Sequence, residues 1–196
     1  MDERDLEGDP LRQFERWFAA AREAAVPVPE AMALATASPD GNPSVRMVLL
    51  KEADERGFSF FTNYESRKSR ELSDNPRAAL LFHWQPLGRQ VRVEGGVGRL
   101  PADESNSYFR TRPLASRLAA WASPQSRPLA DRAELERLYE DAAARHGDEP
   151  TLPPHWGGFR LVPNAYEFWE HGDDRLHDRV RYGRDATGWS RTRLAP

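Results

Sequence analysis

Cations stand among small polar residues at two nearby places in the chain, in a pattern that is typical of an anion site. Arg46 interrupts a run of β-forming residues, and Lys51 ends the same run. Further along, Ser66, Arg67 and Lys68 begin a predicted short helix. Free backbone N–H groups and cations at a helix N-terminus are what a phosphate group requires. The pattern therefore predicts a phosphate site, with a charged sheet edge as the alternative interpretation.

A second set of donors lies at helical spacing. Tyr108, Arg112 and Ser116 are four residues apart, which aligns them on one helical face that Pro113 bends. A guanidinium between two hydroxyl groups is suited to a second phosphate. The alternative is a solvated helix face on which the arginine lies over Phe109.

A third set lies near the C-terminus. Arg175, His177 and Arg179 alternate with other residues, so an extended segment places all three on one face close to Trp169. Donors and cations beside an indole favour a planar anionic ligand. The alternative is an ordinary strand with salt-bridged arginines.

Other catalytic classes have no motif in this chain. There is no nucleophile elbow, no phosphate-binding loop of the Walker type and no dinucleotide fingerprint. The chain has no cysteine, which excludes thiolate catalysis and cysteine metal sites. The five histidines show no metal-ligand spacing beside a carboxylate motif, so we expect no metal site.

The composition bounds the remaining possibilities. The chain has 196 residues, of which 39% are hydrophobic and 30% charged, so we expect a short arm over residues 1–9 and one folded domain over residues 10–196. The net charge of −3 argues against binding to nucleic acid or to an anionic membrane. No signal peptide and no membrane span is recognisable, which predicts a cytoplasmic protein.

The elements that position these residues can be predicted from periodicity and turn signals. Short strands separated by turn residues indicate an antiparallel barrel or sandwich, with strands at 31–37, 44–51, 58–62, 77–84 and 90–100 and closing strands at 158–162, 165–169, 179–182 and 189–194. Residues 44–51 and 58–62 read as a hairpin joined by a turn at 52–57, in which Val45, Met47 and Leu49 share one face. Helices are predicted at 10–25, 65–73, 101–113, 113–121 and 130–145.

Seven runs, in this order, resemble the pyridoxamine 5′-phosphate oxidase family. They are Arg46–Lys51, Thr62–Lys68, Arg89–Gly95, Ser107–Pro113, Ala120–Ser126, Trp156–Arg160 and Arg175–Arg179. The resemblance implies a mainly β fold, a Greek-key split β-barrel with flanking helices that binds flavin mononucleotide (FMN). It also implies a homodimer with FMN at the subunit interface.

The resemblance also assigns roles to residues. It implies that FMN contacts Arg46, Met47, Val48, Leu49, Leu50, Lys51, Phe61, Thr62, Arg67, Lys68, Gln90, Gln125, Ser126, Trp169 and Arg179. Lys51, Tyr108, Arg112 and Ser116 would hold the substrate phosphate, and Arg175 and His177 would lie over the pyridine ring as catalytic residues. The implied reaction transfers a hydride from C4′ of pyridoxamine or pyridoxine 5′-phosphate to the flavin. The flavin is then reoxidised by O2, which yields hydrogen peroxide.

Two departures from the family pattern leave alternatives open. Few residues precede Pro10, so we expect the basic arm that helps to cover the substrate to be missing. The run Phe168–Arg175 reads Phe-Trp-Glu-His-Gly-Asp-Asp-Arg in place of Phe-Trp-Gln-Gly-Arg-Pro-Asn-Arg, which resembles phenazine-biosynthesis oxidases. The alternatives are thus an oxidase of a dihydrophenazine carboxylate and a flavin- or pyridoxal-phosphate-binding protein without turnover.

Overall fold

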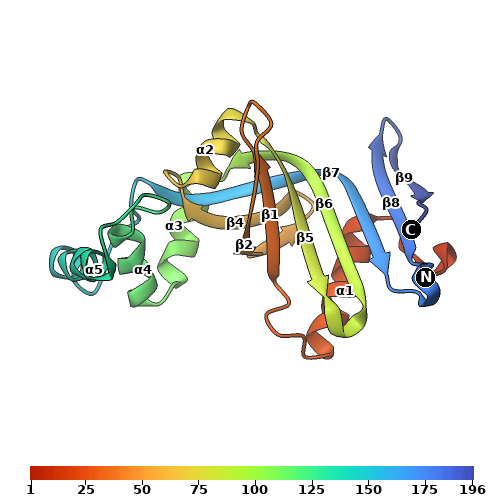
Figure 1. Ribbon diagram of the computed structural model, residues 1–196, viewed down its shortest axis with the longest axis horizontal. Coiled ribbons are helices and arrows are strands. Elements are labelled where there is room, and N and C mark those ends of the chain that lie inside the picture. Colours follow the sequence, from red (N-terminus) through yellow and green to blue (C-terminus); the bar gives the residue numbers. More distant parts are fainter.

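A curled antiparallel sheet forms the centre of the computed structural model, which describes residues 1–196 apart from the side chain of Glu3 (Figure 1). The order of its strands is β2-β1-β5-β6-β7-β4-β3, and β8 and β9 extend it from β7. The strands are β1 Ala31–Ala37, β2 Pro43–Leu49, β3 Glu52–Asp54, β4 Gly57–Asn63, β5 Arg77–Trp84, β6 Arg89–Arg99, β7 Trp156–Glu170, β8 Asp178–Asp185 and β9 Gly188–Arg193.

Strand β2 has the predicted alternation but not the predicted partner. Val45, Met47 and Leu49 share a face, as expected, and that face is exposed in the single chain. The predicted hairpin of 44–51 with 58–62 is wrong, because β2 pairs with β1 and β4 pairs with β3 and β7. The turn that closes the β1–β2 hairpin contains Gly41 at a φ of 84°, and the expected turn after β2 contains the short strand β3.

Strand β7 is a single long strand where two were predicted. It runs from Trp156 to Glu170 and pairs with β4, β6 and β8. Its pairing with β6 shifts register between Glu94 and Gly95, which is a β-bulge. At the bulge the backbones approach so closely that a Cβ atom on Gly95 would lie 2.0 Å from the carbonyl oxygen of Val162.

The helices agree with the prediction to within two or three residues. They are α1 Pro10–Glu23, α2 Arg67–Asp74, α3 Ala102–Thr111, α4 Leu114–Ala122 and α5 Arg132–His146. Helices α3, α4 and α5 lie together at one end of the molecule, and β8 and β9 lie at the other (Figure 1). Within the described residues no helix has both the length and the apolar content needed to cross a membrane.

The core lies between α1 and the concave side of the sheet. Phe14 of α1 is fully buried, and its ring centroid lies 4.9 Å from that of Phe58 and 5.0 Å from that of Phe82. Burial of such aromatic rings is the largest favourable contribution that a single side chain makes to a core. The nine residues before α1, predicted to be a short arm, contribute the buried Leu6 to this core.

Candidate functional site

A pocket of about 550 Å³ opens between β2, β4 and the α3–α4 pair. It brings the first two predicted sets of donors together, apart from Ser66 and Arg67, which do not line it. Its lining residues are Arg46, Met47, Val48, Leu49, Lys51, Phe61, Thr62, Lys68, Tyr108, Thr111, Arg112, Pro113, Ser116, Gln125 and Trp156. The sequence prediction identified most of them, and it missed Trp156, Thr111 and Pro113 as lining residues.

One wall of the pocket is a stack of aromatic rings. Phe61 and Tyr108 stack at 4.0 Å between ring centroids, and Trp156 lies 5.5 Å from Phe61 at an angle of 13°. The guanidinium of Arg112 lies over the Trp156 ring at 4.5 Å, and the Lys51 ammonium lies 5.6 Å from the Tyr108 ring. Such a wall is suited to a ligand that is both aromatic and anionic.

Arg112 does not have the predicted helical backbone, but its side chain lines the pocket together with the other predicted donors. Helix α3 ends at Thr111, Arg112 is extended, with a ψ of 146°, and Pro113 is the N-cap of α4. Tyr108, Arg112 and Ser116 therefore do not share one helical face, but all three line the pocket. Nη1 of Arg112 is buried without a hydrogen-bond partner among the described residues. Burial also lowers the pKa of this guanidinium. An unpaired buried donor of this kind is suited to an anionic ligand.

Lys68 is the buried cation at the inner end of the pocket. Its Nζ donates to Gln125 Oε1 at 2.7 Å, to Thr62 Oγ1 at 3.1 Å and to Ser66 Oγ at 3.3 Å. Burial, with the neighbouring charge of Arg46, lowers the pKa of Lys68 to about 8. Lys68 therefore carries its charge at neutral pH and loses it in mildly alkaline solution.

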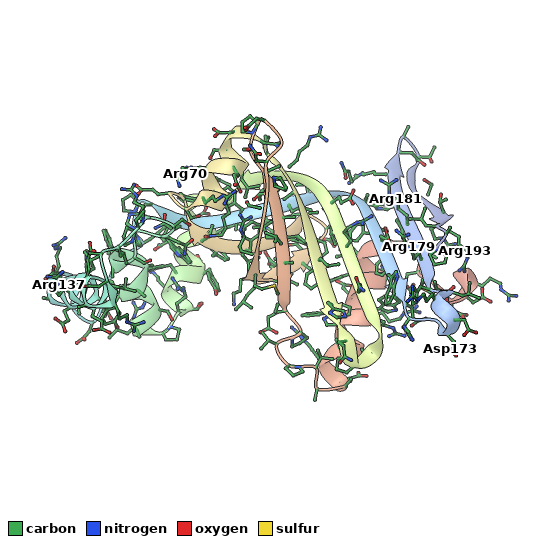
Figure 2. All side chains as sticks on the ribbon, viewed as in Figure 1. Arg70, Arg137, Asp173, Arg179, Arg181 and Arg193 are labelled. Carbon is green, nitrogen blue, oxygen red and sulfur yellow. The ribbon has the colours of Figure 1, made fainter. Side chains whose placement is uncertain are left out.

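Five other predicted residues are here called the β7–β8 group: Gln90, Trp169, Arg175, His177 and Arg179. Gln90 pairs with Trp169 and Trp169 with Arg179 across neighbouring strands. The His177 ring lies 4.6 Å from that of Trp169. None of the five is among the described residues that line the pocket. Figure 2 shows Arg179 beside the C-terminal strands, at the opposite end of the molecule from α3 and α4 (Figure 1).

The predicted extended segment at 175–179 is wrong. Asp173–Arg175 forms a single 3-10 turn, in which Arg175 has a φ of 64°, and β8 begins only at Asp178. The three side chains thus do not lie on one face of a strand. Arg179 is instead held by Glu167, whose carboxylate accepts a hydrogen bond from its Nε at 2.8 Å.

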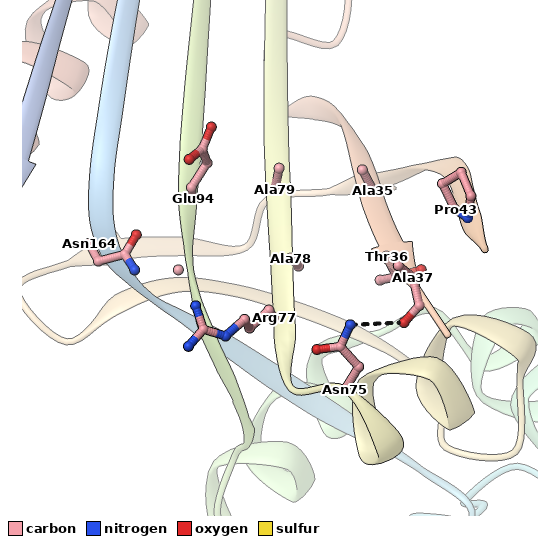
Figure 3. Close-up of a pocket in the computed structure, with 11 residues that line it drawn as sticks. Ala35, Thr36, Ala37, Pro43, Asn75, Arg77, Ala78, Ala79, Glu94 and Asn164 are labelled. Atoms are coloured by element: carbon pink, nitrogen blue, oxygen red, sulfur yellow. Dashed lines mark hydrogen bonds between the residues drawn. The ribbon is translucent and has the colours of Figure 1, made fainter. Parts of the chain in front are cut away.

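Three further predicted FMN contacts lie outside the lining of the pocket. Leu50 is buried in the core, and Arg67 and Ser126 are exposed. A second hollow of about 410 Å³ lies over β1, β5 and β6 (Figure 3). Alanine side chains form much of its lining, and Asn75 there donates to the carbonyl of Ala37 at 3.3 Å. Because it has neither the aromatic wall nor the cluster of cations, we take the first pocket as the candidate site.

Comparison with known proteins identifies the family. Residues 18–146 match the family described as pyridoxamine 5′-phosphate oxidase, and residues 156–196 match the pyridoxine 5′-phosphate oxidase C-terminal dimerisation region. The chain is 55% identical over 199 residues to the pyridoxine/pyridoxamine 5′-phosphate oxidase of Burkholderia vietnamiensis, covering 100% of this chain and 93% of that protein. The chain belongs to the pyridoxamine 5′-phosphate oxidase family. It is an oxidoreductase, as predicted.

Solved structures confirm the predicted fold of this oxidase. PhzG from Burkholderia lata 383, solved in complex with tetrahydrophenazine-1-carboxylic acid, superimposes with a TM-score of 0.93 at 37% identity, covering 98% of this chain and 95% of that one. A related FMN-binding protein from Nostoc punctiforme has the same fold, with a TM-score of 0.76 at 19% identity over 97% of this chain and 100% of that one. The oxidase is a split barrel with flanking helices.

One residue beside the pocket of this oxidase was missed by the sequence analysis. Glu71 of α2 is buried, and its carboxylate accepts hydrogen bonds from Ser44, Thr36 and Arg67. Burial opposes its ionisation, but these bonds outweigh burial and lower its pKa to about 2. The only signal in the sequence was its position four residues after Arg67, which is also common on solvated helices.

Proposed function

We propose that this oxidase uses FMN to convert pyridoxine 5′-phosphate or pyridoxamine 5′-phosphate to pyridoxal 5′-phosphate, with O2 as electron acceptor and hydrogen peroxide as product. The proposal rests on the lining of one pocket, which contains four donors: Lys51, Tyr108, Arg112 and Ser116. Among them, a buried nitrogen of Arg112 has no hydrogen-bond partner. A phosphate dianion beside an aromatic ring supplies the acceptors that this nitrogen lacks. The names of the relatives support the same substrate class.

The other half of the pocket fits a flavin phosphate. Arg46, Lys68, Thr62 and Gln125 would hold FMN, because they offer cations and polar groups beside the Phe61 ring. When bound, FMN supplies a ring system that accepts a hydride and returns the electrons to O2. The chain's own residues bind and orient the substrate: Arg112 fixes the phosphate and thereby sets the position of the pyridine ring.

The β7–β8 group would complete the site from a second subunit. Within one chain none of these residues lines the pocket, and Arg179 lies at the opposite end of the molecule from α3 and α4 (Figure 2). A two-fold dimer can join the pocket of one subunit to the group of its partner. The match to a C-terminal dimerisation region supports this arrangement. His177 would then present Nε2 to the substrate as a hydrogen-bond donor, because its Nδ1 accepts a bond from the Gly172 N–H at 3.2 Å.

A phenazine-type oxidase is the second candidate, since PhzG superimposes over nearly the whole chain. A comparison within one organism favours the vitamin B6 substrate. The chain is 54% identical over 199 residues to the pyridoxine/pyridoxamine 5′-phosphate oxidase of Burkholderia lata and 37% identical to PhzG of that species. The complete set of phosphate donors favours the same substrate.

Anaerobic reduction of the bound flavin tests the proposal. Pyridoxine 5′-phosphate is expected to reduce the flavin of the wild type faster than a dihydrophenazine carboxylate does. Arg112→Ala should weaken binding of pyridoxine 5′-phosphate by about 2–4 kcal/mol, the cost of losing a charge-assisted bond in a partly buried pocket. Its FMN content should stay near that of the wild type.

Arg110→Ala is the matched control, because Arg110 is an exposed arginine of α3 that lies two residues before Arg112. It should bind the substrate as the wild type does. Faster reduction by the phenazine compound, unaffected by Arg112→Ala, would favour the second candidate. No reduction by either compound would leave a binding protein without turnover.

A further inference from the structure

We propose that Glu71 is a positioning residue for the phosphate end of the flavin site, because it holds the guanidinium groups of Arg46 and Arg67 in fixed orientations. The inference rests on the proposed use of FMN. Glu71 does not line the pocket, so it would act on the cofactor only through the two arginines: Arg46 lines the pocket, and Arg67 is exposed next to the lining residue Lys68. It would therefore affect the affinity for the phosphate group rather than for the flavin ring.

Glu71 contacts Arg46 both directly and through two hydroxyl groups. Nη2 of Arg46 lies 3.3 Å from Glu71 Oε2 and also donates to the Ser44 hydroxyl. Nη1 donates to the Thr36 hydroxyl and, at 3.2 Å, to the carbonyl of Leu34. Thr36 and Ser44 in turn donate to Glu71 Oε2. Each hydroxyl group therefore links Arg46 to the Glu71 carboxylate. Together these bonds fix the orientation of the Arg46 guanidinium along the edge that carries Nη1 and Nη2.

Glu71 contacts Arg67 through a single hydrogen bond, donated by Nε of the guanidinium. Nε of Arg67 donates to Glu71 Oε1 at 2.8 Å, where the carboxylate side chain is 8% exposed and the arginine side chain 60% exposed. The two terminal nitrogens of Arg67 and Nε of Arg46 have no hydrogen-bond partner among the described residues. Glu71 thus engages selected nitrogens of each arginine and leaves the others to meet an anion.

The charge of the cluster supports the same ligand. Arg46, Arg67 and Lys68 are cationic, and the ionised Glu71 leaves two positive charges in excess. A phosphomonoester near pH 7 carries a charge close to −2. The cluster is therefore matched to a phosphate dianion. Buried ion pairs fix geometry more reliably than they add stability, which agrees with a positioning role.

The test compares FMN with riboflavin, which is the same flavin without its phosphate. Dissociation constants are measured by flavin fluorescence on the full chain freed of flavin. Glu71→Asp keeps the charge but withdraws the carboxylate from both arginines, so the FMN constant should rise about tenfold while that of riboflavin stays constant. Glu71→Gln keeps the side-chain length and can still accept from Arg46, so it should weaken FMN binding less than Glu71→Asp.

Glu136→Asp is the matched control, because Glu136 pairs with Arg132 at 2.8 Å four residues away on α5, a helix that contributes no residue to the lining of the pocket. It should change neither constant. Equal weakening of FMN and riboflavin by Glu71→Asp would overturn the inference and indicate a purely structural role. A larger loss with Glu71→Gln than with Glu71→Asp would also overturn it, since charge would then matter more than position.

A milder variant covers the case in which Glu71→Asp does not fold. Thr36→Val removes one relay hydroxyl, and it should weaken FMN binding about threefold with riboflavin unchanged. An unchanged FMN constant would overturn the inference. A wild type that binds FMN no better than riboflavin would instead contradict the proposed function, so the two failures are distinguishable.

Discussion

At the scale of single residues, Lys68 predicts how cofactor affinity depends on pH. Its pKa is lowered to about 8, chiefly by burial, and a bound phosphate dianion favours the protonated form. The ammonium is present below pH 8 and is lost above it, so FMN affinity should fall as the pH rises. We expect binding at pH 9 to be about tenfold weaker than at pH 7, measured by fluorescence titration.

Lys68→Arg is the control for this prediction. A guanidinium keeps its charge throughout this range, so the decline between pH 7 and pH 9 should disappear in the variant. Equal FMN affinity of the wild type at the two pH values would show that Lys68 does not meet the phosphate as a cation.

The residue types of the pocket could be predicted, and their mutual contacts could not. Tyr108, Arg112 and Ser116 were singled out because their spacing suggested a guanidinium between two hydroxyl groups, and all three line the pocket although they do not share a helical face. Glu71 was missed because a glutamate on a short polar helix usually faces water. Its carboxylate is hydrogen-bonded to Thr36 of β1 and Ser44 of β2. Only the tertiary structure brings these two strands close to α2.

At the scale of elements, the β-bulge between β6 and β7 predicts a pair of contrasting glycine variants. A Cβ atom on Gly95 would lie 2.0 Å from the Val162 carbonyl oxygen, whereas one on Gly98 would meet nothing within 4 Å. Gly95→Ala should lower the free energy of unfolding by about 3 kcal/mol, because backbone has to move. Gly98→Ala, on the same strand, should change it by less than about 0.5 kcal/mol.

Denaturant unfolding of both variants measures these free energies. Equal stability of the two would mean that the backbones at the bulge can separate without cost. A large loss in Gly98→Ala alone would contradict the close approach of β6 and β7 described above.

The positions of the helices could be predicted from the sequence, but the pairing of the strands could not. Helical spacing and capping residues predicted all five α-helices, since those signals lie within a few residues of each other. The hairpin of 44–51 with 58–62 was wrong because proximity in sequence is only a tendency in sheets. The pairing of β4 with β7 joins residues about 100 positions apart, for which a single sequence holds no signal.

At the scale of the whole molecule, the exposed face of β2 predicts where two subunits meet. Val45 is 69% exposed and Met47 64% exposed in the single chain, which is unusual for neighbouring apolar residues of a strand. In the proposed dimer this face would be covered. Met47→Asp should therefore give a monomer in analytical ultracentrifugation, with FMN binding at least about tenfold weaker because the partner's contacts and an apolar residue of the pocket lining are both lost.

Met47→Leu is the matched variant at the same position. It keeps an apolar side chain and should remain a dimer with the affinity of the wild type. A dimeric Met47→Asp would show that the subunits meet on another face, and a monomer with full FMN affinity would show that one chain suffices for the site.

The long strand β7 also sets the order in which the site can form during synthesis. Trp156, at its start, lines the pocket, and Trp169, near its end, belongs to the β7–β8 group. Strand β4, which pairs with β7 and with the short β3, precedes β7 by about 100 residues and is therefore made much earlier. Because pairings between distant segments form late, neither binding region can be complete until the C-terminal part of the chain has left the ribosome. If the oxidase uses FMN as proposed, only the finished chain should bind the flavin, and newly made protein should pass through a colourless stage.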